Sequence, residues 1–225
     1  YEKKHEFNLG VDLGFLNNRI NATFDIFWRN NYDLIGPMAT QGVGGEVVRY
    51  ANMASMKSRG QEFSLQTQNF KLKDFSWTTN LIFSHVTTEV TELMSQARTM
   101  DLISQNGFAV VGYPYRGLFS IPYAGLDEHG IPQLYTPEDE KTSTDIDFQN
   151  RDKNSYLIYE GPSDPTITGS FGNEFRYKNW RLNIFVTYNF GNVIRLDPVF
   201  RAKYSDLTAM TKEYRNRFMQ SGDEN

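Results

Sequence analysis

Six aromatic residues lie in or beside the irregular stretches of the chain and carry side chains that could contact a ligand. Their flat rings can stack on sugar rings, and the tyrosine hydroxyls can add hydrogen bonds. The alternative is a structural role, in which they pack loops or form the aromatic band of a membrane protein. The candidate ligand-binding residues are Trp28, Tyr32, Tyr50, Tyr113, Tyr115 and Tyr135.

The remaining polar side chains predict no reaction chemistry. Oxygen-bearing side chains alternate in the segment Asp145–Asp152, loosely as in a calcium loop, but the glycine and terminal glutamate of an EF-hand are absent. A solvated acidic loop, or a surface for docking a partner, is the favoured interpretation. His5, His85 and His129 have no metal-ligand spacing, and no GxSxG nucleophile motif occurs. We therefore assign no catalytic residue, metal site or cofactor, and we expect a protein that is not an enzyme.

The clearest structural element is the stretch Thr168–Phe190. In its second half, apolar residues alternate with residues that are polar except for Phe185, which is the pattern of a β-strand with two different faces. Lys178-Asn179 forms a tight polar turn between two arms. Each arm has the ~9–11 residues that a tilted strand needs to cross a bilayer. The alternating apolar side chains are Leu182, Ile184, Val186, Tyr188 and Phe190.

Two further hairpins have the same design. One is predicted from the consecutive segments His5–Phe15 and Arg19–Asn30, and the other from Gly60–Phe70 and Phe75–Thr88. In segment 113–136, Tyr113–Leu126 is long enough to cross a membrane but Ile131–Thr136 is not. We therefore expect a hairpin, with its turn at Asp127–Gly130, that stays on the outer side or leans over the lumen. Long connections are predicted at 31–58, 89–112, 127–167 and 191–225. Within the last, Ser205–Gln220 has helical spacing, with Ser205 as a possible N-cap.

Short turns that alternate with long loops are typical of outer-membrane barrels, which place the two kinds of connection on opposite sides. The mean hydropathy of −0.55 excludes a helical membrane span, because no run approaches ~18 apolar residues. A net charge of −4 without a basic stripe argues against nucleic acid as a partner. We predict an all-β fold: part of an antiparallel transmembrane β-barrel with long extracellular loops and one short loop helix. About six spanning strands are too few for the ~8 of a closed barrel.

Five segments carry a resemblance to known proteins: 57–65 (KSRGQEFSL), 73–84 (KDFSW with Asn80, Phe83 and Ser84), 123–132 (YAGLD with Gly130 and Pro132), 161–179 (GP, TGSF and YKN) and 218–224. Together they resemble the C-terminal barrel region of SusC/RagA-type TonB-linked outer-membrane proteins of Bacteroidetes. Departures from the family pattern include Ser170, where a second glycine is usual, and Phe218 and Gln220, where tryptophan and proline are common. The resemblance covers nearly the whole chain in the same order.

The resemblance implies TonB-dependent import of nutrients, most simply glycan oligosaccharides or peptides, across the outer membrane. It implies a SusD-like surface lipoprotein as a lid and TonB as the source of energy, acting through an N-terminal region. We expect residues 1–225 to belong to the C-terminal half of such a barrel, with signal peptide, plug domain and terminal strands absent. Outer-membrane lipid would meet the apolar face, and the residues expected to face the lumen are Asn21, Asp25, Asn183, Thr187 and Asn189.

Two alternatives remain open from the sequence. A siderophore-type TonB-dependent receptor would share the barrel but not the lipoprotein lid. A soluble glycan-binding β-sandwich would bury the same alternating apolar residues in its own core.

Overall fold

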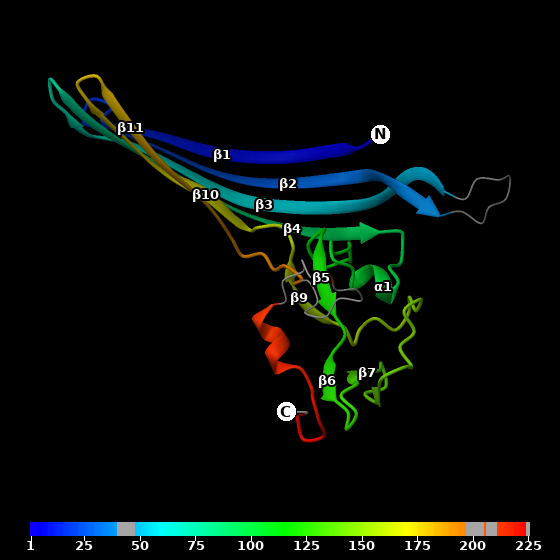
Figure 1. The fold of residues 1–225 in the computed structure, drawn as a ribbon. Helices are drawn as coiled ribbons and strands as arrows, with labels where there is room; N and C mark the ends of the chain where they lie inside the picture. The colour runs from blue at the N-terminus through cyan, green and yellow to red at the C-terminus, as the bar shows by residue number, and fades with distance from the viewer. Residues whose placement is uncertain (40–47, 197–204, 206–210, 224–225) are drawn as a thin grey trace.

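The computed structural model describes residues 1–39, 48–196, 205 and 211–223, and its main feature is a curved antiparallel sheet of six strands (Figure 1). The strand order is β1-β2-β3-β4-β10-β11. The strands are β1 (Lys3–Phe15), β2 (Ile20–Ala39), β3 (Val48–Lys71), β4 (Phe75–Leu93), β10 (Ile167–Tyr177) and β11 (Trp180–Phe190). The predicted all-β antiparallel fold is confirmed. Among the described residues, no helix is long and apolar enough to cross a membrane.

All three hairpin turns lie at one end of this sheet, because β1–β2, β3–β4 and β10–β11 are consecutive antiparallel pairs. Asn17, Asn18 and Lys178 adopt positive φ in these turns, a conformation that asparagine tolerates well. The long connections leave from the opposite end. Figure 1 shows the turns at the upper left and the remaining elements below the other half of the sheet.

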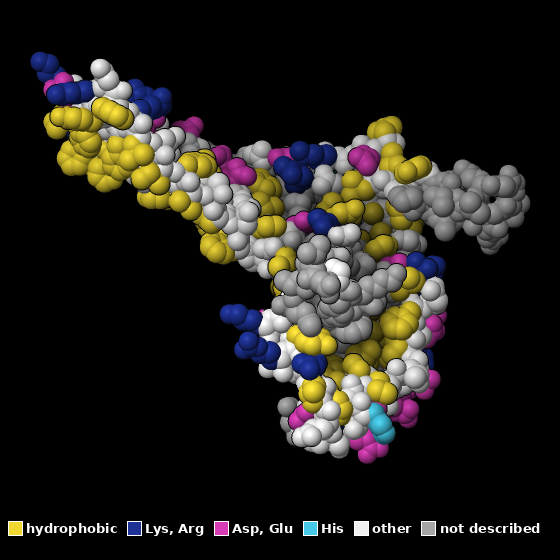
Figure 2. Space-filling view, viewed as in Figure 1, with side chains coloured by type: hydrophobic (Ala, Val, Ile, Leu, Met, Phe, Trp, Pro, Cys, Tyr) yellow, Lys and Arg dark blue, Asp and Glu magenta, His cyan; other side chains and the backbone are white. Residues whose placement is uncertain are grey.

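The sheet has one apolar and one polar face, which the pairing register defines. Leu65 pairs with Ala22 and with Leu81, Leu81 pairs with Phe171, and Phe171 pairs with Val186, so these side chains share a face. We call it the apolar face. Leu182, Ile184 and Val186 on it are 57%, 50% and 54% exposed, so no other part of the described chain covers them. Figure 2 shows hydrophobic side chains gathered near the turn end, beside a tip that carries Lys and Arg.

The opposite side, the polar face, carries ion pairs and hydrogen bonds between neighbouring strands. Arg29 Nε lies 3.0 Å from Glu6 Oε2, and the hydroxyl of Thr23 donates to Asp12 over 2.7 Å. The residues predicted to face the lumen (Asn21, Asp25, Asn183, Thr187 and Asn189) all belong to this face.

Phe185 interrupts the polar row for a reason that the structure makes plain. It pairs with Gly172, and a Cβ on that glycine would approach the Phe185 ring to 2.9 Å. Phe27 is placed in the same way over Gly60. Each ring therefore covers the backbone of a neighbouring strand where a glycine leaves it open.

A network of partly buried polar side chains lies on the apolar face near the turns. The amide oxygen of Asn173 accepts hydrogen bonds from Trp77 Nε1 (2.9 Å) and from the Thr79 hydroxyl (2.8 Å), and Asn69 donates to the same hydroxyl oxygen (2.7 Å). The Trp77 ring stacks on Phe175, with centroids 5.5 Å apart. The network gives these polar groups partners within an apolar surface, where an unsatisfied polar group is costly.

Asn173→Ala is expected to destabilise the sheet, because it leaves Trp77 Nε1 and the Thr79 hydroxyl without their acceptor. The cost should be about 1–3 kcal/mol for each group left unsatisfied. Urea unfolding of the vesicle-inserted native protein measures it, with Asn183→Ala on the polar face of the next strand as the control. Equal stabilities of the two variants would contradict a lipid-facing network.

The remaining elements form a loop subdomain on the long-connection side of the sheet. It contains α1 (Thr99–Leu102), β5 (Gly117–Ser120), β6 (Tyr123–Leu126), β7 (Pro132–Tyr135), β8 (Lys141–Thr142) and β9 (Ile158–Pro162). β5 pairs with β9, and β6, β7 and β8 form a small sheet. The hairpin predicted to turn at Asp127–Gly130 is present as β6–β7, and its location on the outer side stays a prediction.

Three predicted loops contain more regular structure than expected. β2 and β3 extend far into segment 31–58, where Asp33 has positive φ and the register shifts near Leu34. This irregularity reverses which residues share a face, so the period-two pattern is lost although pairing continues. β4 likewise runs to Leu93 within segment 89–112, and β8 and β9 lie within 137–164.

The predicted helix at Ser205–Gln220 lies partly outside the described residues. Ser205 is described and is not helical, 206–210 fall outside the described chain, and the remainder contains a 3-10 helix at Lys212–Asn216. The helical turn α1, in contrast, has no counterpart in the sequence prediction.

Candidate functional site

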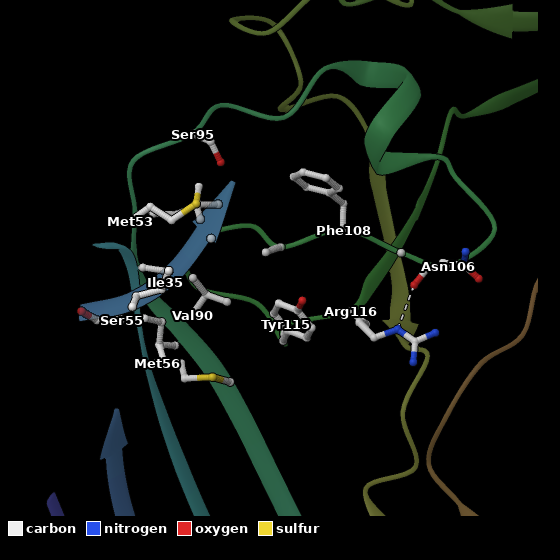
Figure 3. Close-up of a pocket in the computed structure, with 16 residues that line it drawn as sticks. Ile35, Met53, Ser55, Met56, Val90, Ser95, Asn106, Phe108, Tyr115 and Arg116 are labelled. Atoms are coloured by element: carbon white, nitrogen blue, oxygen red, sulfur yellow. Dashed lines mark hydrogen bonds between the residues drawn. The ribbon is translucent and has the colours of Figure 1, made fainter. Parts of the chain in front are cut away.

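A pocket lies at the ends of β2, β3 and β4 that are far from the hairpin turns, where these strands meet the segment 106–116 of the loop subdomain. Its volume is about 470 Å³. Figure 3 shows Ile35, Met53 and Val90 on the strand side, facing Phe108, Tyr115 and Arg116. A rigid sheet thus supplies one wall and a loop supplies the other.

The walls of this pocket are mainly apolar. The strand side combines Ile35 with two methionines, Met53 and Met56, and the loop side adds the ring of Phe108. Val90 is 2% exposed and forms an isolated bridge to Val111, which ties the loop to the sheet. Methionine side chains adapt to irregular shapes, so such a pocket suits an aliphatic or aromatic group.

The polar end of the pocket is formed by Arg116, whose charge is already compensated. Its Nε donates to the carbonyl oxygen of Asn106 (3.1 Å), and its Nη1 lies 2.9 Å from Asp164 Oδ1. The guanidinium group therefore holds two loop segments together. The arrangement can bind by shape and apolar contact, and it contains no group placed for general acid–base or nucleophilic chemistry.

A small hydrophobic core supports the loop wall. Leu102 of α1, Phe119 of β5 and Leu157 are buried together, with Phe108 packed against them. Tyr113 packs on Phe119 and Tyr159, with ring centroids 5.1 and 4.8 Å apart. Burial raises the pKa of the Tyr159 hydroxyl above its ordinary value. The core fixes Phe108 and Tyr113 relative to the sheet.

The first turn of α1 is held by a bidentate ion pair. Arg98 Nε and Nη2 lie 2.9 and 2.8 Å from the two oxygens of Asp101, and the Arg98 backbone N–H donates to the same carboxylate. Hydrogen bonding from Arg98 holds the pKa of Asp101 below its ordinary value. Ionised Asp101 is therefore the form that supports this turn.

Protection of α1 against amide exchange is expected to fall at low pH. Because the folded pKa of Asp101 is lowered, its contribution is full above the unfolded pKa of about 3.9 and is lost as pH falls through the folded value. Protection factors of residues 98–103 at pH 3 and pH 6 measure this, with Asp101→Asn expected to remove the pH dependence and Asp145→Asn to keep it. A pH dependence that survives in Asp101→Asn would refute the role of this carboxylate.

The structure does not gather the six predicted ligand-binding aromatics into one site. Tyr115 lines the pocket and Tyr113 lies in the supporting core beside it. Tyr135 lies in β7 of the small sheet. Tyr32 and Tyr50, expected in a loop, lie instead in β2 and β3, because these strands continue through the predicted loop. Ligand contact by any of the six stays a prediction.

Trp28 has a different position from the other five. It pairs with Arg59 and Phe7 and therefore belongs to the apolar face. Sequence reasoning missed every residue that lines the pocket except Tyr115, among them Met53, Val90, Phe108 and Arg116. No short-range signal marks them, since they come together only through the extension of β3 and β4 and the return of the loop.

The acidic segment Asp145–Asp152 is used locally for turns. Asp147 Oδ1 accepts the backbone N–H of Gln149, and Asn150 Oδ1 accepts those of Asp152 and Lys153. Across the described part of the chain, no three His, Asp or Glu side chains are grouped as metal ligands.

Comparison with known proteins places these features in a wider context. No family model matches the sequence. The chain is 28% identical over 211 residues to the TonB-dependent receptor SusC of Bacteroides thetaiotaomicron, which covers 88% of this chain and 20% of SusC. It is 25% identical over 213 residues to the TonB-dependent receptor P3 of Formosa agariphila, covering 86% of this chain and 21% of that receptor.

Solved structures show the same relationship in three dimensions. The RagAB peptide importer in its open-open state has a TM-score of 0.68 and 25% identity over 85% of this chain, and the RagAB peptide transporter has a TM-score of 0.67. In sequence and fold this chain is therefore similar to SusC/RagA-type TonB-dependent receptors. It spans about a fifth of the length of the curated relatives it matches.

The similarity to SusC and RagAB extends over most of the chain. Relatives and structural neighbours match 84–88% of the chain, so the likeness includes both the six-stranded sheet and the loop subdomain. The relatives and structural neighbours are named as receptors, transporters or importers.

Proposed function

We propose that this chain forms part of the C-terminal half of the β-barrel of a TonB-dependent outer-membrane transporter, which imports oligosaccharides or peptides together with a SusD-like surface lipoprotein. One observation carries the proposal: the six-stranded sheet has an exposed apolar face, a polar face and all its short turns at one end. Such a sheet suits a barrel wall between lipid and an aqueous lumen. The similarity to SusC and RagAB supports the same conclusion.

The apolar face also argues against a soluble β-sandwich. A sandwich would bury Leu182, Ile184 and Val186 against a second sheet. The other two sheets of the described chain have only two and three short strands, and these apolar residues are at least 50% exposed. Contact with lipid accounts for this exposure directly.

The location and mass of the native protein test the proposal. An antibody raised against this chain would be used on fractionated cells, with outer-membrane samples run on a gel with and without boiling. A heat-shifting band several-fold heavier than 26.0 kDa is the expected result. A soluble band near 26.0 kDa would instead point to the sandwich and overturn the transporter assignment.

The partner is tested by affinity purification of the native protein from mild detergent. A surface lipoprotein that copurifies in equal amount is the expected result, and it would form the lid over the long-loop end. A barrel that purifies without any lipoprotein, and takes up ferric chelates, would favour the siderophore-type receptor.

Of the two cargo classes, the pocket favours peptides with an apolar side chain. Its aliphatic and methionine walls offer few hydrogen-bond partners for sugar hydroxyls. Ala109→Phe would fill the pocket and is expected to slow uptake of leucine-containing peptides while sparing polar ones. Tyr123→Phe, an exposed position outside the pocket, is the control. Unchanged peptide uptake in Ala109→Phe would exclude the pocket from cargo binding.

A further inference from the structure

A cationic cluster lies on the apolar face of the sheet at its long-loop end. The register places Arg59 beside Trp28 on one side and Thr87 on the other, and places Lys57 between Asn30 and Glu89. These residues, with Ser58 and Thr88, surround a depression of about 430 Å³. Cluster and apolar residues thus share one continuous surface. We refer to it as the Arg59 depression.

The position of this depression along β3 matches the headgroup region at the edge of a bilayer. Phe70, in the aromatic stack near the turns, and Arg59 lie on the same strand. At about 3.4 Å per residue the separation is about 37 Å along the strand, or about 28 Å along the membrane normal for a tilt of about 40°. An apolar band is about 25 Å tall, so Arg59 lies just beyond it, at headgroup level.

The side chains of the depression have the chemistry of a headgroup site. Arg59 is exposed, and its Nε donates to the Thr87 hydroxyl (3.3 Å), while its two terminal nitrogens donate to no other side chain or carbonyl among the described residues. Lys57 Nζ lies 2.9 Å from Glu89 Oε1. Trp28 is 48% exposed and packs on Phe7 with ring centroids 5.8 Å apart. Tryptophan at this height is typical of the aromatic belt.

We infer that the Arg59 depression binds the phosphate group of a phosphorylated lipid headgroup in the outer leaflet, an inference that rests on the proposed outer-membrane location. Arginine binds phosphate through two parallel hydrogen bonds, and lysine adds a point charge. Trp28 and Phe7 contact the start of the acyl chains. Glu89 neutralises part of the positive charge, so the net charge of Lys57, Arg59 and Glu89 is +1. The affinity for phosphate is therefore lower than it would be without the Glu89 carboxylate.

Native mass spectrometry of the detergent-purified native protein tests the inference, with diphosphoryl lipid A, the same lipid without phosphate, and inorganic phosphate as probes. Arg59→Gln is expected to weaken binding of diphosphoryl lipid A about tenfold, the loss of one charge-assisted contact. Glu89→Gln is expected to strengthen it. Lys71→Gln, an exposed position at the other end of β3, removes the same charge and is expected to change nothing.

Three outcomes would overturn the inference. One is unchanged binding in Arg59→Gln, the second is an equal loss in Lys71→Gln, and the third is equal binding of the lipid without phosphate. Displacement of the lipid by inorganic phosphate would indicate a free-anion site instead. The heat-shift gel shows that each variant still forms a barrel, so a negative result in an outer-membrane protein refutes this site and leaves the proposed function standing.

Discussion

Val186→Arg is expected to lower the free energy of unfolding of the membrane-inserted protein by about 2–4 kcal/mol, the cost of a basic side chain facing lipid near the bilayer midplane. Val186 pairs with Phe171, in a row that continues through Leu81, Leu65 and Ala22 near the middle of the apolar face. It is 54% exposed, so nothing in the described chain could shield the charge.

The adjacent position supplies the control. Thr187 pairs with Ser170 on the polar face, so Thr187→Arg should enter the aqueous lumen at little cost. Urea unfolding of both variants in lipid vesicles, followed by tryptophan fluorescence, measures the difference. Similar losses for the two variants would mean that the two faces do not meet different solvents.

Gly169→Ala is expected to be the most damaging single-methyl change in the sheet, with a loss of at least about 3 kcal/mol from overpacking and a broken hydrogen bond. An added Cβ would lie well inside contact distance of two oxygens, the Ile82 carbonyl and the Tyr188 hydroxyl. The first is main chain of β4 and cannot move without opening the β4–β10 pairing. The second donates to that same Ile82 carbonyl over 3.0 Å, across β10.

Two further variants separate the effect of overpacking from that of the broken hydrogen bond. Tyr188→Phe removes only the hydrogen bond, which should cost about 1 kcal/mol. Gly14→Ala meets a movable side-chain oxygen, Asn18 Oδ1, at 2.8 Å, and should be well tolerated. The same vesicle unfolding assay applies. A loss in Gly169→Ala no larger than in Gly14→Ala would show that β10 and β4 are less closely packed than described.

The strands and turns of the sheet could be predicted because they depend on residues that are close in sequence. The alternation from Leu182 to Phe190 and the turn at Lys178-Asn179 involve neighbours in sequence, and they gave the hairpin that the structure contains. The two-faced pattern follows from the same period of two. Phe185 is the exception in this pattern. Its explanation is its cross-strand partner Gly172, which no local sequence pattern identifies.

The loop subdomain and the pocket were not predictable in the same way. The register shift near Leu34 breaks the alternation, so the long extensions of β2 and β3 resembled a loop. The pocket joins Met53 to Phe108 across more than fifty residues, a contact set by tertiary pairing rather than by spacing. Aromatic composition singled out Tyr115, which lines the pocket, together with Trp28, which lies on the apolar face, and could not distinguish the two positions.

The central claim, that the apolar face meets lipid and the polar face meets water, is tested most directly by two single-cysteine variants. This chain contains no cysteine, so Val186→Cys and Thr187→Cys each introduce one labelling position within it. A nitroxide on each is compared for collisions with oxygen, which concentrates in lipid, and with a water-soluble nickel chelate. The account predicts oxygen-dominated relaxation at 186 and nickel-dominated relaxation at 187. Nickel access at both positions, or protection of 186 from both reagents, would contradict it.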